Sequence, residues 1–460
     1  MRENNVSLRL TFVSNGDIIY MLLRWQKATL FIAFSRRRTT MKTKAVRIYG
    51  QNDLRFEEFE LPEMQDDEIL AKVISDSVCM SSHKAALQGA AHARVPNDIA
   101  QNPTIIGHEF CGEILAVGKK WQHKFKPGDG FAIQPALGWQ GKLDALGYSY
   151  RFIGGNSQYV VIPNEVMECN CLLPYDNDTY FYGSLAEPVS CIIASYHTNY
   201  HTNNSTHLHK MGIVEGGNTI LMAAAGPMGL GAIDYAIHCD RKPGLLVVTD
   251  IDNARLARAA SIMTVEEAEK NGVKLIYVNT NEVENARDYL MELTGGKGYD
   301  DAFVYAPVKP VVELADSVLG FDGCLNFFAG PTDKQFSAMF NFYHVHYSFT
   351  HICGNTGGNT DDMIEAIEMM NDGRLNPTAM ITHIGGLDAV VDTVINLDKI
   401  PGGKKLIYNF ISMPLVALSD LAELGKDNEL YRELAKIVEK NNGMWCAEAE
   451  KYLLANAKPI

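Results

Sequence analysis

The pattern of hydrophobic and polar positions changes once along the chain. Between residue 41 and about residue 188, short apolar runs are separated by turn sequences such as Lys-Pro-Gly-Asp at 126–129. Runs of this length and spacing predict β-strands, here at 72–75, 114–117, 131–134 and 159–162. The first half of the chain is therefore expected to be rich in short strands.

From about residue 215, buried strands alternate with amphipathic helices. The predicted strands are 219–223, 245–249, 274–278, 302–306 and 324–329. The predicted helices are 227–239, 253–263, 283–294 and 308–319. This alternation is typical of a doubly wound parallel sheet with crossover helices. The fold class is therefore α/β, with a β-rich domain followed by a parallel-sheet domain.

The last hundred residues continue with a helix at 361–371 and a strand at 404–408. Residues 412–460 form a polar tail in which four leucines are spaced for one apolar helix face: Leu421, Leu424, Leu430 and Leu434. These tail residues indicate no chemistry. We expect the tail to pack on the rest of the chain or on a partner subunit.

Residues 1–40 do not follow either pattern. Their apolar run, 28–34, is followed by arginines and is much shorter than the roughly 18–20 residues of a membrane helix. A secretory signal would place its charges before the apolar run. The six arginines faintly suggest a transit peptide, but Glu3 and Asp17 weaken that interpretation. We interpret 1–40 as a leader outside the fold, with Met41 beginning the first strand.

Composition excludes several classes of function. The chain has 460 residues, with 55 acidic and 41 basic side chains and a net charge of -14, so a broad nucleic-acid interface is not expected. Nine scattered cysteines are too few for a disulfide-stabilised secreted protein. We therefore expect a cytoplasmic protein that binds neither nucleic acid nor membrane.

A glycine-containing turn follows the strand at 219–223. Its sequence, Ala224-Ala225-Gly226-Pro227-Met228-Gly229, matches G-x-G-x-x-G except for alanine at the first glycine. Gly226 would let the backbone approach a pyrophosphate, and Gly229 would let the helix pack closely on the strand. Pro227 suits the first helical position, and the helix N-terminus offers free N–H groups to phosphate. These residues predict a dinucleotide site.

A carboxylate at the end of the next strand suggests which dinucleotide binds. Asp250 lies at the spacing expected for a ribose-binding residue, where it would accept bonds from a free 2′-hydroxyl and repel a 2′-phosphate. NAD(H) is therefore expected. Arg255 and Arg258 lie close by and would soften this preference, so NADP(H) stays open.

Four candidate metal ligands precede the dinucleotide region: Cys79, His108, Glu109 and Glu187. A catalytic zinc takes three protein ligands from cysteine, histidine and carboxylate and keeps an open position. Glu187 lies among apolar residues, where a carboxylate is costly to bury without a partner. Each residue alone could be structural, but their joint occurrence before a dinucleotide fold favours a metal site.

The stretch Gly107-His108-Glu109-x-x-Gly112-x5-Gly118 resembles the zinc-site pattern of the medium-chain dehydrogenase/reductase superfamily, although Trp121 departs from the small residue usual there. The turn at 125–129 and the closing Gly403-Lys404-Lys405-Leu406-Ile407 are also similar. The likeness covers about residues 41–411. It implies a GroES-like catalytic domain, 41–188 with 354–411, around a Rossmann domain, 189–353, with the active site between them.

The resemblance also implies a ligand set. Zinc would be held by Cys79 and His108 with Glu109 or Glu187, and the Glu-Pro at 187–188 is similar to the polyol dehydrogenase branch. Many relatives bind a structural zinc with four cysteines after the Pro-Gly-Asp turn, but residues 130–168 contain no cysteine. We therefore expect one catalytic zinc per chain.

The segment 79–84 resembles the family's proton-relay segment. Ser81 falls on the hydroxyl that passes a proton, while Lys84 replaces the usual histidine and leaves that part of the relay open. Ser81, Lys84 and Glu109 are the expected catalytic residues.

Within the superfamily, 214–217, 229–235 and 355–362 are most similar to L-sorbose 1-phosphate reductases, which implies an oxidoreductase acting on a ketose or polyol phosphate. The candidates for binding the phosphate are Lys84, Arg94 and Arg151. Relatives form dimers and tetramers, so a homo-oligomer is expected.

Two other functions remain open. One is a zinc dehydrogenase of an unphosphorylated polyol or of L-threonine, and the other is a noncatalytic nucleotide-sensing or interaction protein. A histidine cluster (His197, His201, His207 and His209) has a polar setting with no acidic or cysteine partner inside it. We interpret it as a loop and not as a second metal site.

Overall fold

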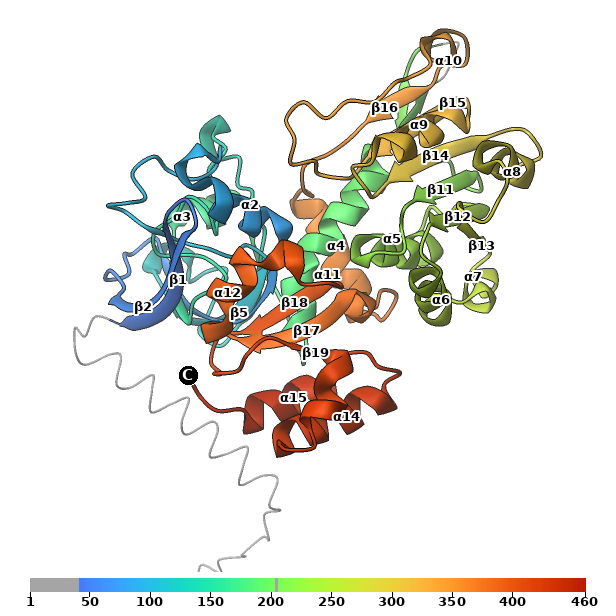
Figure 1. The fold of residues 1–460 in the computed structure, drawn as a ribbon. Helices are drawn as coiled ribbons and strands as arrows, with labels where there is room; N and C mark the ends of the chain where they lie inside the picture. Colours follow the sequence, from blue (N-terminus) through green and yellow to red (C-terminus); the bar gives the residue numbers. More distant parts are fainter. Residues whose placement is uncertain (1–40, 203–205) are drawn as a thin grey trace, which may run out of the picture.

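Figure 1 shows a computed structural model of the chain, which describes residues 41–202 and 206–460. The leader predicted at 1–40 lies outside the described residues. Blue and cyan strands from the first part of the chain lie beside orange strands from its last part, and the green-to-yellow elements form a second body. Among the described helices, none is long and apolar enough to cross a lipid bilayer.

The larger sheet combines strands from both ends of the chain. Its order is β19-β17-β18-β3-β5-β6-β8, and β7 also pairs with β3. Their bounds are β3 Ile69–Val78, β5 Phe110–Val117, β6 Gly130–Ile133, β7 Tyr159–Ile162, β8 Leu172–Pro174, β17 Ile381–Gly386, β18 Lys404–Tyr408 and β19 Val416–Ala417. The strands predicted between 72 and 162 are all present here. Because β18 pairs with β3, residues near 404 come close to residues near 78.

A smaller antiparallel sheet covers part of this body. It contains β1 (Lys42–Gly50), β2 (Asp53–Glu60) and β4 (Thr104–Ile105) in the order β2-β1-β4. The body also contains three short helices, α2 (Met80–Gln88), α3 (Asn164–Glu168) and α12 (Val390–Ile395). Helix α2 begins directly after β3, and this turn carries Cys79.

The second body is built on a six-stranded parallel sheet in the order β13-β12-β11-β14-β15-β16. The strands are β11 Asn218–Met222, β12 Leu245–Asp250, β13 Lys274–Asn279, β14 Tyr299–Val304, β15 Leu319–Phe327 and β16 His351–Cys353. The strand order reverses between β11 and β14, and ligands of doubly wound sheets bind at such a point. The α/β fold class with a parallel Rossmann sheet is confirmed.

The helices of this body are α5 Pro227–His238, α6 Asn253–Ile262, α7 Val265–Lys270, α8 Ala286–Leu293, α9 Lys309–Ser317 and α10 Phe342–Tyr347. The predicted helix at 283–294 begins later than expected because the Asn285 side chain caps it by accepting from Asp288 N–H. A hairpin of β9 (Tyr200–Thr202) and β10 (His209–Met211) lies beside β15.

Two longer helices connect the bodies. Helix α4 (Phe181–Thr198) packs on α11 (Thr360–Asn371), and both pack on the apolar core that also includes α5. The domain boundary expected at 188/189 falls inside α4. The hydrophobic core is therefore continuous through this helix.

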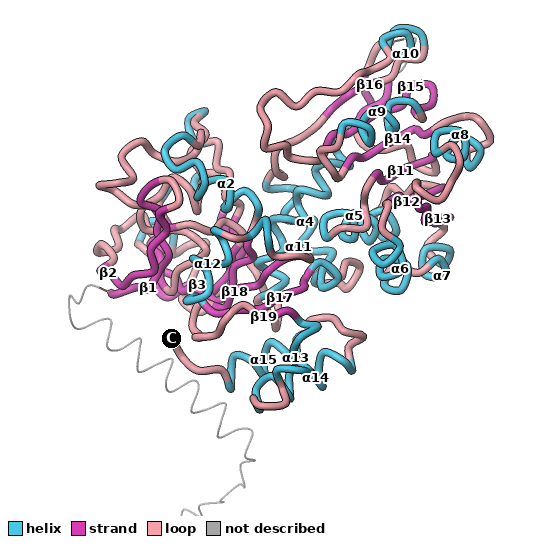
Figure 2. The backbone as a smooth tube through the Cα atoms, viewed as in Figure 1, coloured by secondary structure: helices cyan, strands magenta, loops and turns pink. Residues whose placement is uncertain are grey.

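The tail forms three helices, α13 Leu421–Leu424, α14 Glu429–Lys440 and α15 Ala447–Asn456, which lie under β17 and β19 in Figure 2. Leu421 and Leu434 are fully buried in the core shared with β17, β18 and α4, whereas Leu424 is 41% exposed. The chain leaves its helix at Gly425, so the four leucines do not share one face. The tail packs on the body that contains the larger sheet.

Candidate metal and nucleotide sites

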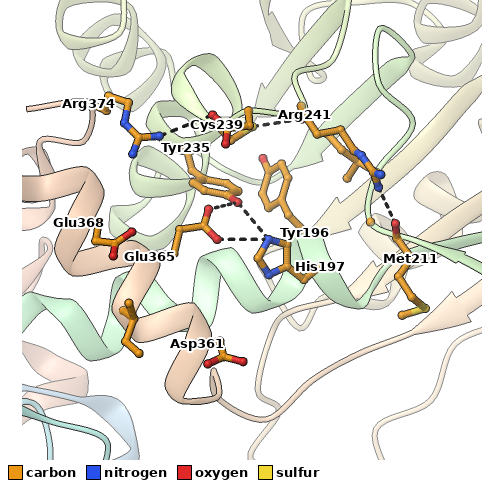
Figure 3. A pocket seen from close by; sticks show the side chains of 14 residues that line it. Tyr196, His197, Met211, Tyr235, Cys239, Arg241, Asp361, Glu365, Glu368 and Arg374 are labelled. Carbon is orange, nitrogen blue, oxygen red and sulfur yellow. Dashed lines mark hydrogen bonds and ion pairs between the residues drawn. The ribbon is translucent and has the colours of Figure 1, made fainter. Parts of the chain in front are cut away.

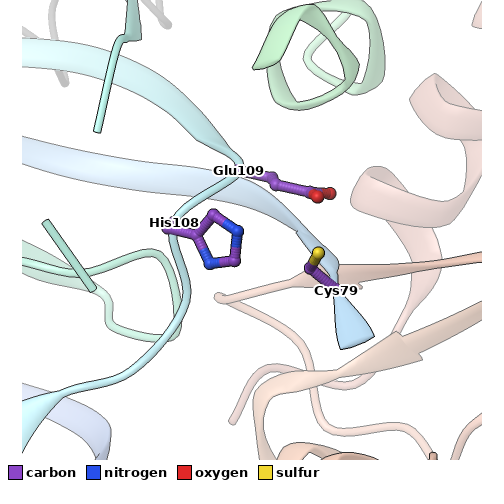
Figure 4. A group of neighbouring side chains, drawn as sticks. All are labelled: Cys79, His108 and Glu109. Carbon is purple, nitrogen blue, oxygen red and sulfur yellow. The ribbon is translucent and has the colours of Figure 1, made fainter. Parts of the chain in front are cut away.

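Three of the predicted ligands meet in the structure. The Cys79 Sγ, a ring nitrogen of His108 and a carboxylate oxygen of Glu109 all lie within 4.8 Å of one another (Figure 4). Among the described residues, no other group of three or more His, Cys, Asp or Glu side chains lies close enough together to hold a metal ion. Cys79 caps α2, while His108 and Glu109 immediately precede β5. The pairing of β3 with β5 brings them together.

The electrostatics of the group suit a divalent cation. Burial lowers the pKa of His108 to about 4, so the imidazole is neutral and one ring nitrogen carries a lone pair that could bind a metal. Burial and the Glu109 carboxylate raise the pKa of the Cys79 thiol to about 12. A metal ion would reverse that shift because it stabilises the thiolate.

Glu109 has an additional partner that the sequence did not reveal. Lys404 Nζ lies 2.6 Å from both of its carboxylate oxygens, and the Ser77 hydroxyl donates to Oε2. Both members of the ion pair are buried. Lys404 belongs to the Gly-Lys-Lys segment, which in the sequence only contributed to a family likeness.

Glu187 lies near the group but is not one of the three. It projects from α4, and Cys191 Sγ donates to its Oε1 over 3.5 Å. Burial, followed by the Glu109 carboxylate, raises the pKa of Glu187 to about 7. Glu187 is thus a half-buried carboxylate whose pKa Glu109 helps to raise.

The two residues expected in the proton relay, Ser81 and Lys84, lie in different surroundings. Ser81 stays beside the group, since its N–H donates to Cys79 Sγ over 3.5 Å. Lys84 Nζ instead donates to the carbonyl of Gly330, after β15, over 2.9 Å. In this structure Lys84 connects α2 to the Rossmann body.

Tyr148, which sequence reasoning missed, links the metal group to a cation. Its hydroxyl lies 3.3 Å from His108 Nε2. His92 stacks on its ring with centroids 5.6 Å apart, and the Arg94 guanidinium lies 5.7 Å from the ring centroid. The residue lies in a loop with no motif, so only the folded chain reveals it.

The predicted phosphate-binding residues do not all gather here. Arg94 lies on the Tyr148 ring and acts electrostatically on His108 and Glu187. Arg151 is exposed and lies over Phe152, whose ring packs in a separate apolar cluster. The structure therefore brings Arg94, but not Arg151, to the metal group.

The glycine turn has the geometry expected for a dinucleotide. A Cβ on Gly229 would lie 1.9 Å from the Ala224 carbonyl, so α5 packs too closely on the turn after β11 for any other residue. A Cβ on Gly226 would meet nothing within 4 Å, which leaves open space where a pyrophosphate would approach. Gly226 caps α5, Pro227 is its first residue and Met228 packs partly against the core.

Asp250 ends β12 and is oriented by three backbone donors. Its Oδ1 accepts from Ile251 N (2.8 Å) and Asp252 N (3.1 Å), and its Oδ2 accepts from Ala225 N (3.2 Å). Arg255 is exposed and lies 3.7 Å from Asp252. The carboxylate is thus held against the glycine turn, where a ribose would lie.

Comparison with known proteins agrees with this geometry. Residues 65–170 match the alcohol dehydrogenase GroES-like domain, and residues 227–372 match the zinc-binding dehydrogenase family. The mannitol-1-phosphate 5-dehydrogenase of Aliivibrio fischeri is 51% identical over 90% of this chain and 97% of its own length. The L-sorbose 1-phosphate reductase of Klebsiella pneumoniae is 50% identical over 91% and 98%.

The chain belongs to the zinc-binding dehydrogenase family. The solved structure of 2R,3R-butanediol dehydrogenase from Bacillus subtilis shares its fold, with a TM-score of 0.63 and 21% identity over 80% of this chain and 99% of that one. The family resemblance and the GroES-like and Rossmann architecture inferred from the sequence are confirmed. The dehydrogenase class excludes the noncatalytic alternative.

The histidines at 197–209 do not form a second metal site among the described residues of the dehydrogenase. His197 pairs with Asp362 over 2.8 Å, and His201 with Asp301 over 3.2 Å. Their acidic partners lie far away in sequence, and part of the segment is a β-hairpin instead of the expected loop. His197 borders a pocket of about 560 Å³ between α4, α5 and α11 (Figure 3).

Proposed function

We propose that this dehydrogenase reduces L-sorbose 1-phosphate to D-glucitol 6-phosphate with NADH, reversibly. The single observation that supports this most is the position of Arg94 on the Tyr148 ring, beside the metal group. A cation there would bind a phosphate close to the reacting carbon. The Klebsiella relative carries the corresponding name.

The residues present fit a zinc ion. Cys79, His108 and Glu109 would hold it, with Glu187 as the alternative to Glu109, and a thiolate, a neutral imidazole and a carboxylate are donors that zinc prefers. When bound, zinc supplies a Lewis acid that polarises the substrate carbonyl, and NADH supplies the hydride. We propose one such ion per chain.

The chain's own residues bind, orient and move a proton. Lys404 and Ser77 hold Glu109 in one orientation, and Ser82 Oγ, 3.2 Å from Nδ1, orients His108. The Ser81 hydroxyl, next to the metal group through the Ser81 N–H bond to Cys79 Sγ, donates the proton that the product alcohol gains. Ketone, NADH and one proton thus give alcohol and NAD⁺.

The nucleotide would lie over the glycine turn. Gly226, Met228 and the N-terminus of α5 would face the pyrophosphate, and Asp250 the ribose. We propose NAD(H) as the preferred cofactor because Asp250 is fixed at the ribose position. The exposed Arg255, 3.7 Å from Asp252, is the residue that would favour NADP(H).

The second candidate substrate is mannitol 1-phosphate, because a relative of nearly equal identity is named for it. In L-sorbose 1-phosphate the ketone is adjacent to the carbon that bears the phosphate. In a reaction at position 5 of mannitol 1-phosphate, the reacting carbon lies at the far end of the carbon chain from the phosphate. A phosphate at Arg94 favours the first arrangement.

A substrate panel tests the proposal. Purified zinc-loaded protein would be assayed through NADH absorbance with L-sorbose 1-phosphate, L-sorbose and fructose phosphates, and in the oxidative direction with mannitol 1-phosphate and L-threonine. We expect the highest kcat/KM for L-sorbose 1-phosphate and a lower value with NADPH. A higher value for unphosphorylated L-sorbose would refute a phosphate site.

We also propose a cytoplasmic homo-oligomer with the domain division 41–188 with 354–411, 189–353 and 412–460. Large side chains are exposed on α10 and at the edge strand β16, namely Phe342, Tyr343, Tyr347 and Ile352. Patches of this kind usually mark an interface. Light scattering of the purified protein tests the oligomer, and a monomer at micromolar concentration would contradict it.

A further inference from the structure

A carboxylate from the C-terminal tail is buried at the start of α4. Glu450, on α15, is 1% exposed. Its Oε2 accepts from the N–H of Tyr180 over 2.7 Å, and its Oε1 accepts from the N–H of Phe181 over 2.9 Å. These N–H groups are among those that a helix N-terminus leaves without partners. A residue 270 positions away thus caps α4.

The same carboxylate also binds the larger sheet. The Tyr408 hydroxyl, on β18, donates to Glu450 Oε1 over 2.9 Å and accepts from Trp445 Nε1 over 2.8 Å. Trp445 is fully buried. Glu450 therefore joins α4 and β18 through three hydrogen bonds. Trp445 adds a further contact between the tail and β18.

Both elements also carry groups of the metal site. Helix α4 carries Glu187 two turns after its capped end, and β18 carries Lys404, the partner of Glu109. In a strand, Lys404 and Tyr408 share one face because side chains alternate. Glu450 thus contacts both of the elements that carry Glu187 and Lys404.

We propose that Glu450 is a positioning residue, which fixes α4 and β18 relative to each other and thereby places Glu187 and Lys404 at the metal group. This inference rests on the proposed zinc-dependent function. Burying a carboxylate is costly unless donors surround it, and an apolar side chain could fill the same space in a merely structural contact. The three donors hold the Glu450 carboxylate in one orientation, which a nonspecific apolar contact would not do.

Cobalt(II) substitution tests this inference without substrate. The visible absorption of Co²⁺ depends on its ligands, and chelator competition gives the metal affinity. The variants are Glu450→Ala, Glu450→Gln and Tyr408→Phe. The matched control is Glu448→Ala on the same helix, because Glu448 is exposed and pairs only loosely with Lys440, at 3.6 Å.

We expect Glu450→Ala and Tyr408→Phe to shift the cobalt spectrum and to lower metal affinity and kcat by about tenfold, as for residues that orient metal ligands. KM for NADH should not change. Glu450→Gln keeps one acceptor oxygen and should fall between wild type and Glu450→Ala. Glu448→Ala should match wild type.

The inference fails if the variants unfold at lower temperature while the cobalt spectrum, metal affinity and kcat stay those of wild type. Glu450 would then only stabilise the fold. If Glu450→Ala does not fold, Glu450→Gln and Tyr408→Phe decide through the same measurements. A wild-type protein that does not reduce L-sorbose 1-phosphate refutes the substrate, whereas the cobalt spectra still decide the role of Glu450.

Discussion

Lys404 Nζ lies 2.6 Å from both carboxylate oxygens of Glu109, although 295 residues separate them. The pair is buried, at 9% and 1% side-chain exposure. Lys404 thus supplies a fixed positive charge beside a cysteine, a histidine and two carboxylates. Without it, the metal-free site would hold uncompensated buried carboxylates.

Replacing Lys404 should therefore destabilise the metal-free protein most. Removing one partner of a buried ion pair costs about 3–5 kcal/mol, and we expect this loss for Lys404→Met without metal. Zinc should restore part of it because the ion supplies positive charge. Urea unfolding with and without zinc measures both values. Lys405→Met is the control, because Lys405 Nζ bonds only to backbone carbonyls, and its effect should not depend on zinc.

The two glycines of the nucleotide turn should respond differently to alanine. Gly229→Ala would place a Cβ 1.9 Å from the Ala224 carbonyl, and such overpacking costs about 1–3 kcal/mol of folding free energy. Gly226→Ala meets open space, so stability should change by less than about 0.5 kcal/mol. Its NADH dissociation constant should nevertheless rise by about tenfold or more, equivalent to about 1.4 kcal/mol.

Thermal unfolding and fluorescence titration with NADH separate these effects. Unchanged NADH affinity in Gly226→Ala would show that the pyrophosphate does not approach this residue. Wild-type stability in Gly229→Ala would contradict the close packing of α5 on the turn that follows β11.

The parts of the site whose residues lie close together along the chain could be predicted from the sequence. His108 with Glu109 and Gly226 with Gly229 form short motifs, since their spacing follows from one turn or one strand. The alternation of strands and helices after residue 215 was also sufficient to predict the Rossmann sheet, because a parallel sheet imposes that pattern. Burial of the central strands β11, β12 and β14 on both faces made their apolar runs clear.

The parts that depend on tertiary packing could not be predicted. Lys404 and Tyr148 reach the site from β18 and a loop, whereas Glu450 contacts α4 and β18 from the tail, and all three contacts join residues far apart in sequence. Arg94 and Arg151 were equivalent candidates until the fold placed only Arg94 beside Tyr148. The leucine pattern of the tail was wrong at Leu424, because the helix ends at Gly425.

Stability should depend on pH through Glu450. Burial raises the pKa of Glu450 from 4.5 to about 7, so folding takes up a proton between these values. The stabilisation is therefore complete below pH 4.5 and is lost as the pH rises through 7. Wild type should lose on the order of 3 kcal/mol relative to Glu450→Gln from pH 4.5 to above pH 7.

Urea unfolding of both proteins at several pH values measures this difference. Glu448→Gln serves as the control, because its exposed carboxylate should leave the profile of wild type unchanged. A constant difference between wild type and Glu450→Gln across this range would mean that the pKa of Glu450 is the same in the folded and unfolded chains.

Substrate phosphate should depend on Arg94 and not on Arg151. A hydrogen bond to a charged group contributes about 1.5–3 kcal/mol, so Arg94→Ala should raise KM for L-sorbose 1-phosphate by about 10–100-fold. KM for NADH and the activity toward unphosphorylated L-sorbose should stay the same. Arg151→Ala is the matched control, because Arg151 is exposed over Phe152 and should leave all three values unchanged. Equal effects of the two substitutions would place the phosphate away from the Tyr148 ring, and the preference for a ketone adjacent to the phosphate would lose its structural support.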